Sequence, residues 1–159
     1  MKIREKEPKD QPWIEKILDE RWGGEGRVVA HGEIFDVRLL PALIGGEQES
    51  LATYEIRRTD DIVFAELITL DAVTAKQGVG TALIEALISR LRVEGVSVLR
   101  VTTTNDNLDA LRFYQRRGFR ITAVRPGAVD KARRVKPSIS QIGEYGIPIR
   151  DEIELERLL

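Results

Sequence analysis

The segment A-K-Q-G-V-G-T-A-L-I-E-A-L, residues 75–87, places two glycines at the start of an amphipathic helix. An apolar run at residues 62–70 comes before it and predicts a strand. The first N–H groups of a helix have no partner within it, and glycine lets an anion approach the bare backbone. Gly78 and Gly80 would allow this approach, and Thr81 would add a hydroxyl. A strand, a glycine turn and a helix in this order predict a site for an anionic ligand such as a phosphate. Short Gly-x-Gly segments are also common as ordinary tight turns.

A second patterned segment, N-D-N-L-D-A-L-R-F-Y-Q-R-R-G-F at residues 105–119, follows another apolar strand at residues 96–102. Together the two segments resemble the GCN5-related N-acetyltransferase superfamily. In that family a motif Q/R-x-x-G-x-G/A holds the pyrophosphate of acetyl-coenzyme A, and a second motif has the form N-x-x-A-x-x-x-Y followed by G-F. The second motif is matched by Asn107, Ala110 and Tyr114, with Gly118 and Phe119 after them. Ala75 stands where the first motif usually has Gln or Arg, which predicts weaker phosphate binding but leaves the backbone cradle.

The resemblance implies a mixed α/β fold of the α+β kind. Its centre would be a mixed β-sheet of about seven strands, with parallel central strands that splay apart and about four flanking helices. It also implies acetyl-coenzyme A as the cosubstrate and no metal. The residues that it implies for coenzyme binding are Gln77, Gly78, Val79, Gly80 and Thr81 at the pyrophosphate, the main chain of Ile68 and Leu70 along the pantetheine arm, and Asn107.

Length and composition narrow the class of protein. A chain of 159 residues is most simply one domain, residues 1–159, with a full hydrophobic core. Charged residues make up 32%, yet the formal net charge is only −1, which favours neither nucleic acid nor an anionic membrane as a partner. The absence of cysteine excludes a disulfide framework, a thiol nucleophile and a thiolate metal site. No segment resembles a signal peptide or a membrane span, so we expect a cytoplasmic protein.

Local patterns predict the remaining elements. A helix capped by Asp10 or Gln11 should run to the glycines at 23 and 24, and strands near 39–44 and 50–57 should form an antiparallel hairpin. Further helices are expected from about residue 78 to 94 and over 108–117, and strands over 119–124 and at 151–159. Residues 27–38 fit no pattern, and the prolines and glycines of 125–150 predict a long ordered loop.

Two side chains are candidates for the chemistry of acetyl transfer, which requires a neutral amine and a proton for the departing thiolate. Tyr114 is the expected acid, as in relatives with Tyr at this position; by spacing alone it would be an aromatic core residue. Glu66 is the expected base, because a carboxylate inside an apolar strand shares the alternation face of Phe64 and Ile68. A β-bulge that turns Glu66 outward to solvent or to a salt bridge is the alternative.

Other candidates have ordinary explanations. Asn107 could bond the pantetheine, cap its own helix, or do both. His31 is the only histidine and has no partner by sequence, so a catalytic role is not expected. The basic run at residues 131–136 is read as a solvated face rather than as a site for the 3′-phosphate of the coenzyme.

The sequence therefore predicts an acetyl-coenzyme A-dependent N-acetyltransferase that transfers acetyl directly to a primary amine. The acceptor would be a small-molecule amine or a peptide, and its identity is not encoded in any motif. Two rivals are a non-catalytic acyl-coenzyme A-binding module on the same fold and a nucleotide-binding domain of another fold; no P-loop motif supports the latter. A homodimer is possible through pairing of the last strand with a second copy.

Overall fold

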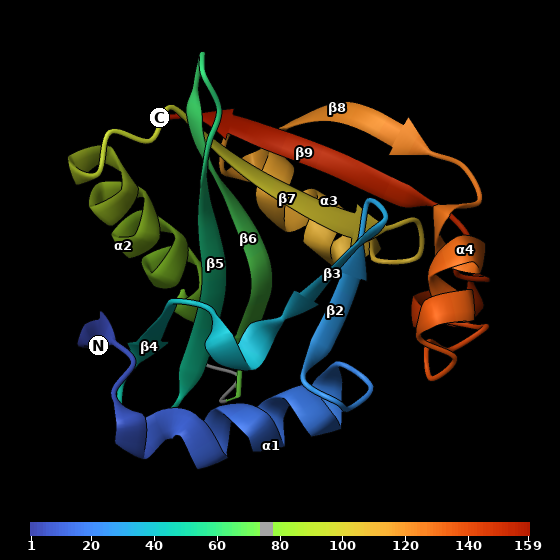
Figure 1. The fold of residues 1–159 in the computed structure, drawn as a ribbon, viewed down its shortest axis with the longest axis horizontal. Helices are drawn as coiled ribbons and strands as arrows, with labels where there is room; N and C mark the ends of the chain where they lie inside the picture. Colours follow the sequence, from blue (N-terminus) through green and yellow to red (C-terminus); the bar gives the residue numbers. More distant parts are fainter. Residues whose placement is uncertain (74–77) are drawn as a thin grey trace.

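A seven-stranded mixed sheet forms the centre of the molecule (Figure 1). The computed structural model describes residues 1–73 and 78–159. From one edge of the sheet to the other, the strands are β1 (Ile3–Glu5), β4 (Ala42–Gly45), β5 (Ser50–Arg58), β6 (Val63–Ala72), β7 (Val98–Thr104), β9 (Glu152–Leu158) and β8 (Arg120–Arg125). Neighbouring strands are antiparallel except β6 and β7, which are parallel.

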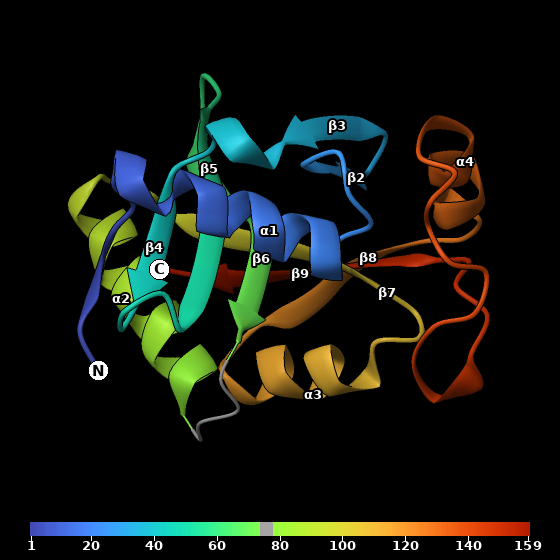
Figure 2. The same ribbon diagram turned by 90° about the horizontal axis from the view of Figure 1, so that it is seen from below.

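Helices cover both faces of this sheet. They are α1 (Gln11–Arg21), α2 (Val79–Val93), α3 (Leu108–Arg116) and α4 (Ala128–Val135), with 3-10 turns at Pro8–Asp10, Val37–Leu39 and Glu144–Gly146. Figure 2 shows α1 on one face, together with a separate two-stranded sheet of β2 (Arg27–Ala30) and β3 (Glu33–Asp36), and α2 and α3 on the other. The expected mixed fold is confirmed. None of the described helices has the length and apolar character needed to cross a membrane.

Each face of the sheet buries its own apolar cluster. Under α2, the side chains Leu83, Leu87 and Leu91 recur at helical spacing and pack on Leu99 and Leu155. On the other face, apolar residues of α1 pack with residues of β4, β5 and β6, among them Ile14, Leu18, Ile44 and Ile68. The long strand β6 is buried on both sides, as its unbroken apolar sequence predicts.

Three expectations need correction. The hairpin of β4 and β5 is confirmed, but β4 begins at Ala42 because residues 37–39 form a 3-10 turn capped by Asp36, whose Oδ1 accepts from the amide of Arg38. The predicted loop at 125–150 is wrong in part, since it contains α4. Pro126 and Gly127 signal a break, but Gly127 caps α4 in a left-handed conformation (φ +72°), and Val129 and Ala132 form a buried apolar face.

The last strand is confirmed as a strand, and it lies inside the sheet rather than at its edge. β9 pairs with β7 on one side and with β8 on the other, so neither side is free to pair with a second copy. The expected route to a homodimer through this strand is therefore wrong. The edges of the sheet are β1 and β8.

Candidate functional site

A slot opens where the two parallel strands separate. β6 and β7 pair only from Phe64 with Val98 to Leu67 with Val101, and beyond that point both strands continue apart (Figure 1). Their divergence leaves main-chain groups at the end of β6 without a strand partner on this side. Ile68 and Leu70, the main-chain contacts expected for the pantetheine arm, lie in this unpaired part.

A β-bulge at Ile68 marks the mouth of the slot. β5 pairs Tyr54 with Leu67 and Thr53 with Thr69, so Ile68 is the extra residue. The bulge breaks the alternation of side chains: Leu67 and Leu70 both pack toward α2, whereas Ile68 packs on the α1 side. Bulges re-aim backbone groups next to active sites, and this one lies beside the carboxylate of Glu66 without turning it outward.

The glycine turn before α2 has two different structural roles. Gly78 caps the helix in the left-handed region (φ +85°), with open space where a Cβ would be. A Cβ on Gly80 would come within 3.1 Å of the ring of Phe113 in α3, so this glycine lets the two helices approach. Val79 is buried. Gln77, and Ala75 with the departure from the motif, lie outside the described residues.

An arginine that the sequence analysis did not single out lies beside this turn. The guanidinium of Arg117 donates to the hydroxyl oxygen of Thr81 from Nε (2.8 Å) and Nη2 (2.6 Å), and it stacks on Phe113 at 3.8 Å from the ring centroid. Thr81 therefore accepts from Arg117 and keeps its own hydroxyl proton for another acceptor. In the sequence, the pair of arginines at 116–117, close after Tyr114, could have indicated a cation near the glycine turn.

A cleft of about 620 Å³ runs from the glycine turn along α3. Its walls include Leu70 at the end of β6, Gly80, Asn107, Tyr114 and Arg117. Arg112 and Arg116 add two further cations. We call it the coenzyme-side cleft. Its length along a helix, its cationic wall and its glycine turn suit an extended polyanionic ligand.

Tyr114 is both a core residue and a wall of this cleft. It is 7% exposed and makes edge-to-face contacts with Phe113 and Phe119, at centroid distances of 5.3 and 5.2 Å. Burial raises the pKa of its hydroxyl, and the negative charge of Asp71 adds to the effect. The hydroxyl therefore keeps its proton at neutral pH. Asn107 caps α3, its Oδ1 accepting from the amide of Ala110 at 3.1 Å, and it lines both the cleft and the slot.

Glu66 points into the slot. Its side chain is 4% exposed, and its Oε2 lies 2.8 Å from Nε2 of His31. Its other oxygen, Oε1, is buried and has no hydrogen-bond partner among the described residues; Nη1 of Arg57 is 3.7 Å away. A buried carboxylate oxygen without a donor is rare and points to a donor supplied by a ligand or a water molecule.

His31 comes to Glu66 from a part of the chain that fits no sequence pattern. It occupies the turn of the β2–β3 hairpin with φ +40°, and its amide donates to both carboxylate oxygens of Glu152 at 3.1 Å. The hydrogen bond to Glu66 raises the pKa of His31, the charges of Glu66 and Glu33 act in the same direction, and burial opposes them. The sequence alone gives His31 no partner, because Glu66 is remote from it along the chain.

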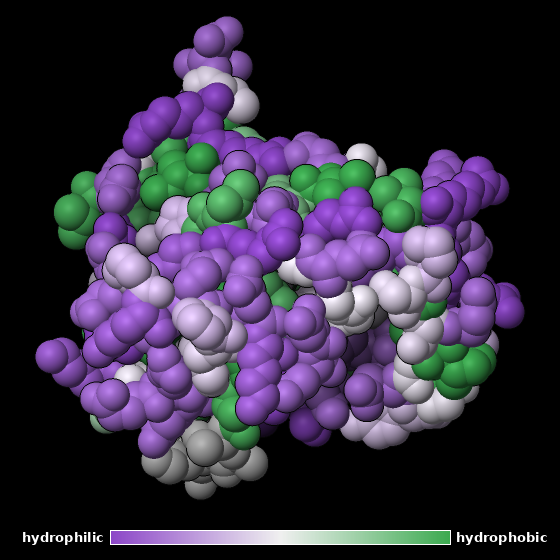
Figure 3. Space-filling view, turned by 60° about the horizontal axis from the view of Figure 1, so that its bottom comes forward, coloured by the Kyte–Doolittle hydropathy of each residue, from purple (hydrophilic) through white to green (hydrophobic). Residues whose placement is uncertain are grey.

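Two larger cavities share lining residues with the slot. The slot itself has about 140 Å³ and is lined by residues of β2, β6 and β7 together with Trp22, Asn107 and Glu152. Asn107 also lines the coenzyme-side cleft. On the opposite side, Trp22, Thr104 and Glu152 also line a cleft of about 680 Å³, which α1, α4 and the segment 138–149 enclose. We call it the acceptor-side cleft. In Figure 3 the surface is hollowed toward the part of the molecule that carries α4.

Comparison with known proteins agrees with this architecture. Residues 5–119 match the family model described as the acetyltransferase (GNAT) family. The chain is 32% identical to the uncharacterized protein YxbD of Bacillus subtilis, over 96% of this chain and 94% of that protein. It is 40% identical to the uncharacterized protein YdhI of the same organism, over 72% and 69%.

Solved structures share the fold at lower identity. An IAA acetyltransferase from Bacillus cereus superimposes with a TM-score of 0.68 at 19% identity, covering 99% of this chain and 100% of that one. A GNAT family acetyltransferase from Elizabethkingia anophelis, solved with acetyl-CoA bound, gives a TM-score of 0.67 at 19% identity, covering 99% and 97%.

Proposed function

Because this chain belongs to the acetyltransferase (GNAT) family, we propose that it transfers the acetyl group of acetyl-coenzyme A directly to a primary amine. The observation that supports the proposal is the slot between β6 and β7, which shares lining residues with a cationic cleft and with a second cleft and holds an oxygen of Glu66 that accepts no hydrogen bond from the described residues. Two substrates could enter from opposite sides and meet there. Such an arrangement needs no covalent enzyme intermediate.

The residues present fit the coenzyme. The first turn of α2 and the open space at Gly78 offer backbone N–H groups to a pyrophosphate, and Arg117 adds positive charge at Thr81. The unpaired main chain of β6 beyond Leu67 can bond an amide chain as a strand would. The bound coenzyme supplies an activated thioester, and the remaining chemistry belongs to the protein.

Glu66 is the proposed base. Its free Oε1 accepts a proton from the acceptor ammonium, directly or through one water, and the neutral nitrogen then attacks the acetyl carbonyl carbon. Main-chain N–H groups near the bulge at Ile68 stabilise the negative charge on the carbonyl oxygen. The C–N bond forms, the nitrogen releases its second proton to water, the C–S bond breaks, and the sulfur takes the hydroxyl proton of Tyr114, which bulk water restores. His31 holds the carboxylate of Glu66 through its other oxygen.

Isothermal calorimetry with acetyl-coenzyme A tests the binding half of this proposal. Wild-type protein should bind, and Gly80→Glu should not, because the new side chain would occupy the cradle and press on Phe113. Ser89→Glu is the matched control, since it places the same side chain at an exposed position of the same helix. Circular dichroism verifies that each variant is folded. Absence of binding to the wild type would refute an acetyl-coenzyme A-dependent function.

A non-catalytic acyl-coenzyme A-binding module is the alternative, and it predicts a different response. It would bind the coenzyme through the same cleft but would release no free thiol when supplied with amines. Removal of the Tyr114 hydroxyl would then change nothing, whereas an enzyme should lose turnover.

A further inference from the structure

The acceptor-side cleft has a strongly uneven charge. Its walls carry five carboxylates, from Asp19, Glu20, Asp106, Glu144 and Glu152, and only two cations, from Arg21 and Lys136. A cluster of acids alone does not define a ligand. In this protein, however, it shares walls with the slot, where the buried Oε1 of Glu66 accepts no hydrogen bond from the described residues and Nη1 of Arg57 lies 3.7 Å away. Both features call for a ligand that donates hydrogen bonds and carries positive charge.

The two cations are held at the cleft wall by contacts of their own. The ammonium of Lys136 is buried and donates to the main-chain carbonyls of Trp22 and Arg27, which fix its position. Arg21 donates to the carbonyl of Ala72 at 3.2 Å and lies 4.0 Å from Asp71, at the end of β6. The charged groups of both side chains are thus engaged with other elements.

Several of the carboxylates have no cationic partner. Among the described residues, no cation lies within ion-pair distance of Asp19, Asp106 or Glu144. Asp106 is buried and accepts from the hydroxyl of Thr104 and from the amide of Glu144 at 3.0 Å. Glu20 meets Lys16 only at 4.0 Å, and Glu152 is paired with Arg125. Carboxylates thus outnumber cations among the lining residues of the cleft by five to two.

The position of these acids separates them from the reacting nitrogen. Asp19, Glu20, Asp106 and Glu144 line the acceptor-side cleft but not the slot, whereas Glu66 lines the slot but not the cleft. If one nitrogen of an acceptor lies at Glu66, the acids of the acceptor-side cleft would therefore surround another part of that acceptor. The volume of about 680 Å³ lies in the range of small-molecule sites.

We infer that the acceptor is a small aliphatic amine with a second cationic group, such as a diamine, in which one nitrogen reacts at Glu66 while the other stays charged among the acids of the acceptor-side cleft. This inference rests on the proposed function and adds the chemical class of the acceptor. One ammonium nitrogen gains the acetyl group and loses two protons, one of which is balanced by the thiol of the departing coenzyme A while the other goes to solvent, and the second ammonium is unchanged.

A series of acceptors of one length tests the inference. The probes are 1,4-diaminobutane, 4-amino-1-butanol and 4-aminobutanoate, which differ only in whether the second group is positive, neutral or negative. We expect kcat/KM for the diamine to exceed that for the amino alcohol by about tenfold, and the amino acid to be poorer again, as a few partly solvated charge interactions would give. Added salt should reduce the preference.

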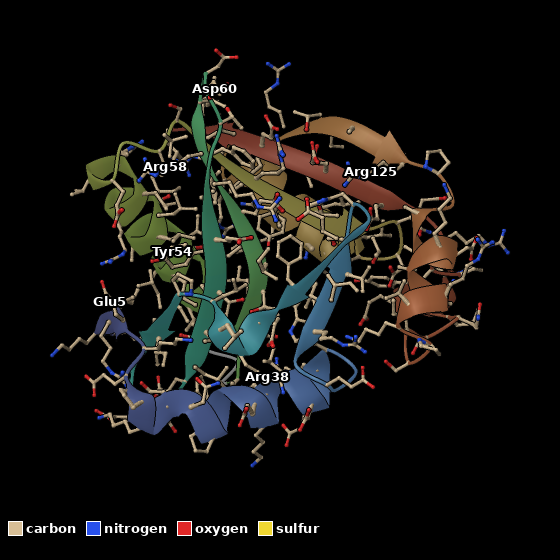
Figure 4. All side chains as sticks on the ribbon, in the orientation of Figure 1. Glu5, Arg38, Tyr54, Arg58, Asp60 and Arg125 are labelled. Atoms are coloured by element: carbon tan, nitrogen blue, oxygen red, sulfur yellow. The ribbon has the colours of Figure 1, made fainter. Side chains whose placement is uncertain are left out.

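Variants locate the preference in the cleft. Asp19→Asn combined with Glu144→Gln should bring the ratio of diamine to amino alcohol close to one, because it lowers kcat/KM for the diamine much more than for the amino alcohol. Asp60→Asn is the matched control, because Asp60 lies at the tip of the β5–β6 turn, far from α4 (Figure 4). The inference is overturned if the amino alcohol is used as well as the diamine, if the ratio survives in the double variant, or if none of the three amines is acetylated.

Calorimetry distinguishes these failures from failure of the proposed function. If acetyl-coenzyme A binds and the acceptor preference is absent, only the class of acceptor is wrong. If the coenzyme does not bind to the wild type, the acetyltransferase proposal itself fails.

Discussion

Replacement of His31 by glutamine should remove a pH-dependent part of the stability. Glutamine can still donate to Glu66 but carries no charge. His31 and Glu66 are 15% and 4% exposed, and their hydrogen bond is 2.8 Å long. A hydrogen bond to a charged group contributes about 1.5–3 kcal/mol, and partial solvent exposure of the imidazole reduces the charge-dependent share to about 1–2 kcal/mol.

The sign of the effect follows from the raised pKa of His31. In the unfolded chain histidine titrates near pH 6.5, so the extra stability is fully present below about that pH and is lost as the pH rises through the higher folded-state pKa. The wild-type free energy of unfolding should therefore fall by about 1–2 kcal/mol from this source between pH 6 and 9. Since the chain has one histidine, no other imidazole contributes in this window.

Urea unfolding of both proteins at several pH values measures this difference. Burial raises the pKa of Asp71 and lowers that of Lys136, which moves both toward the window, and subtraction of the His31→Gln curve removes their common contribution. Glu33→Gln serves as a control for a weaker contact, because Glu33 is 45% exposed and lies 3.8 Å from Nδ1 of His31. This variant should change the pH dependence of the free energy of unfolding less than Glu66→Gln does. Equal pH slopes in wild type and His31→Gln would refute the reasoning.

Three further predictions concern the coenzyme side of the site. Tyr114→Phe should lower kcat by about 10²-fold while the Kd for acetyl-coenzyme A stays unchanged, because only a proton donor is lost from a buried ring. Steady-state kinetics measures kcat and calorimetry measures the Kd. Unchanged turnover would contradict the role of Tyr114 as the acid. Arg117→Gln should raise the Kd for acetyl-coenzyme A by about tenfold and weaken its salt dependence. Arg120→Gln, at an exposed position of β8, should change neither. Equal effects of the two variants would exclude a direct contact between Arg117 and the coenzyme. Asn107→Ala should cost about 1 kcal/mol of stability through loss of the α3 cap, and Asn107→Asp should retain most of it, as thermal unfolding would show.

Local patterns in the sequence predict much of the fold. The apolar spacing of α2, the continuous apolar run of β6 and the cap at Asn107 each depend on neighbours within one or two turns, and each is found where it was expected. α4 was missed because Pro126 and Gly127 resemble a loop signal, and its apolar face consists of only two buried side chains, Val129 and Ala132.

The site is less accessible to sequence reasoning because its contacts join distant segments. His31 meets Glu66 across two separate sheets, and Arg117 meets Thr81 between two helices. Neither pair has a fixed spacing along the chain, so no motif reports it. The interior position of β9 is equally invisible, since pairing order depends on the whole sheet rather than on the composition of one strand.

The place of β9 between β7 and β8 also has a consequence for biosynthesis. β8 leaves the ribosome before β9 but reaches the rest of the sheet only through it, so β8 must wait unpaired until residues 152–158 have emerged. Glu152, which holds the turn of the β2–β3 hairpin, arrives in the same late segment. The coenzyme side also depends on this segment, because Leu155 packs in the core under α2 and Arg157 donates to the main-chain carbonyl of Arg117 at the end of α3. The walls of both clefts are therefore completed only when β9 is in place.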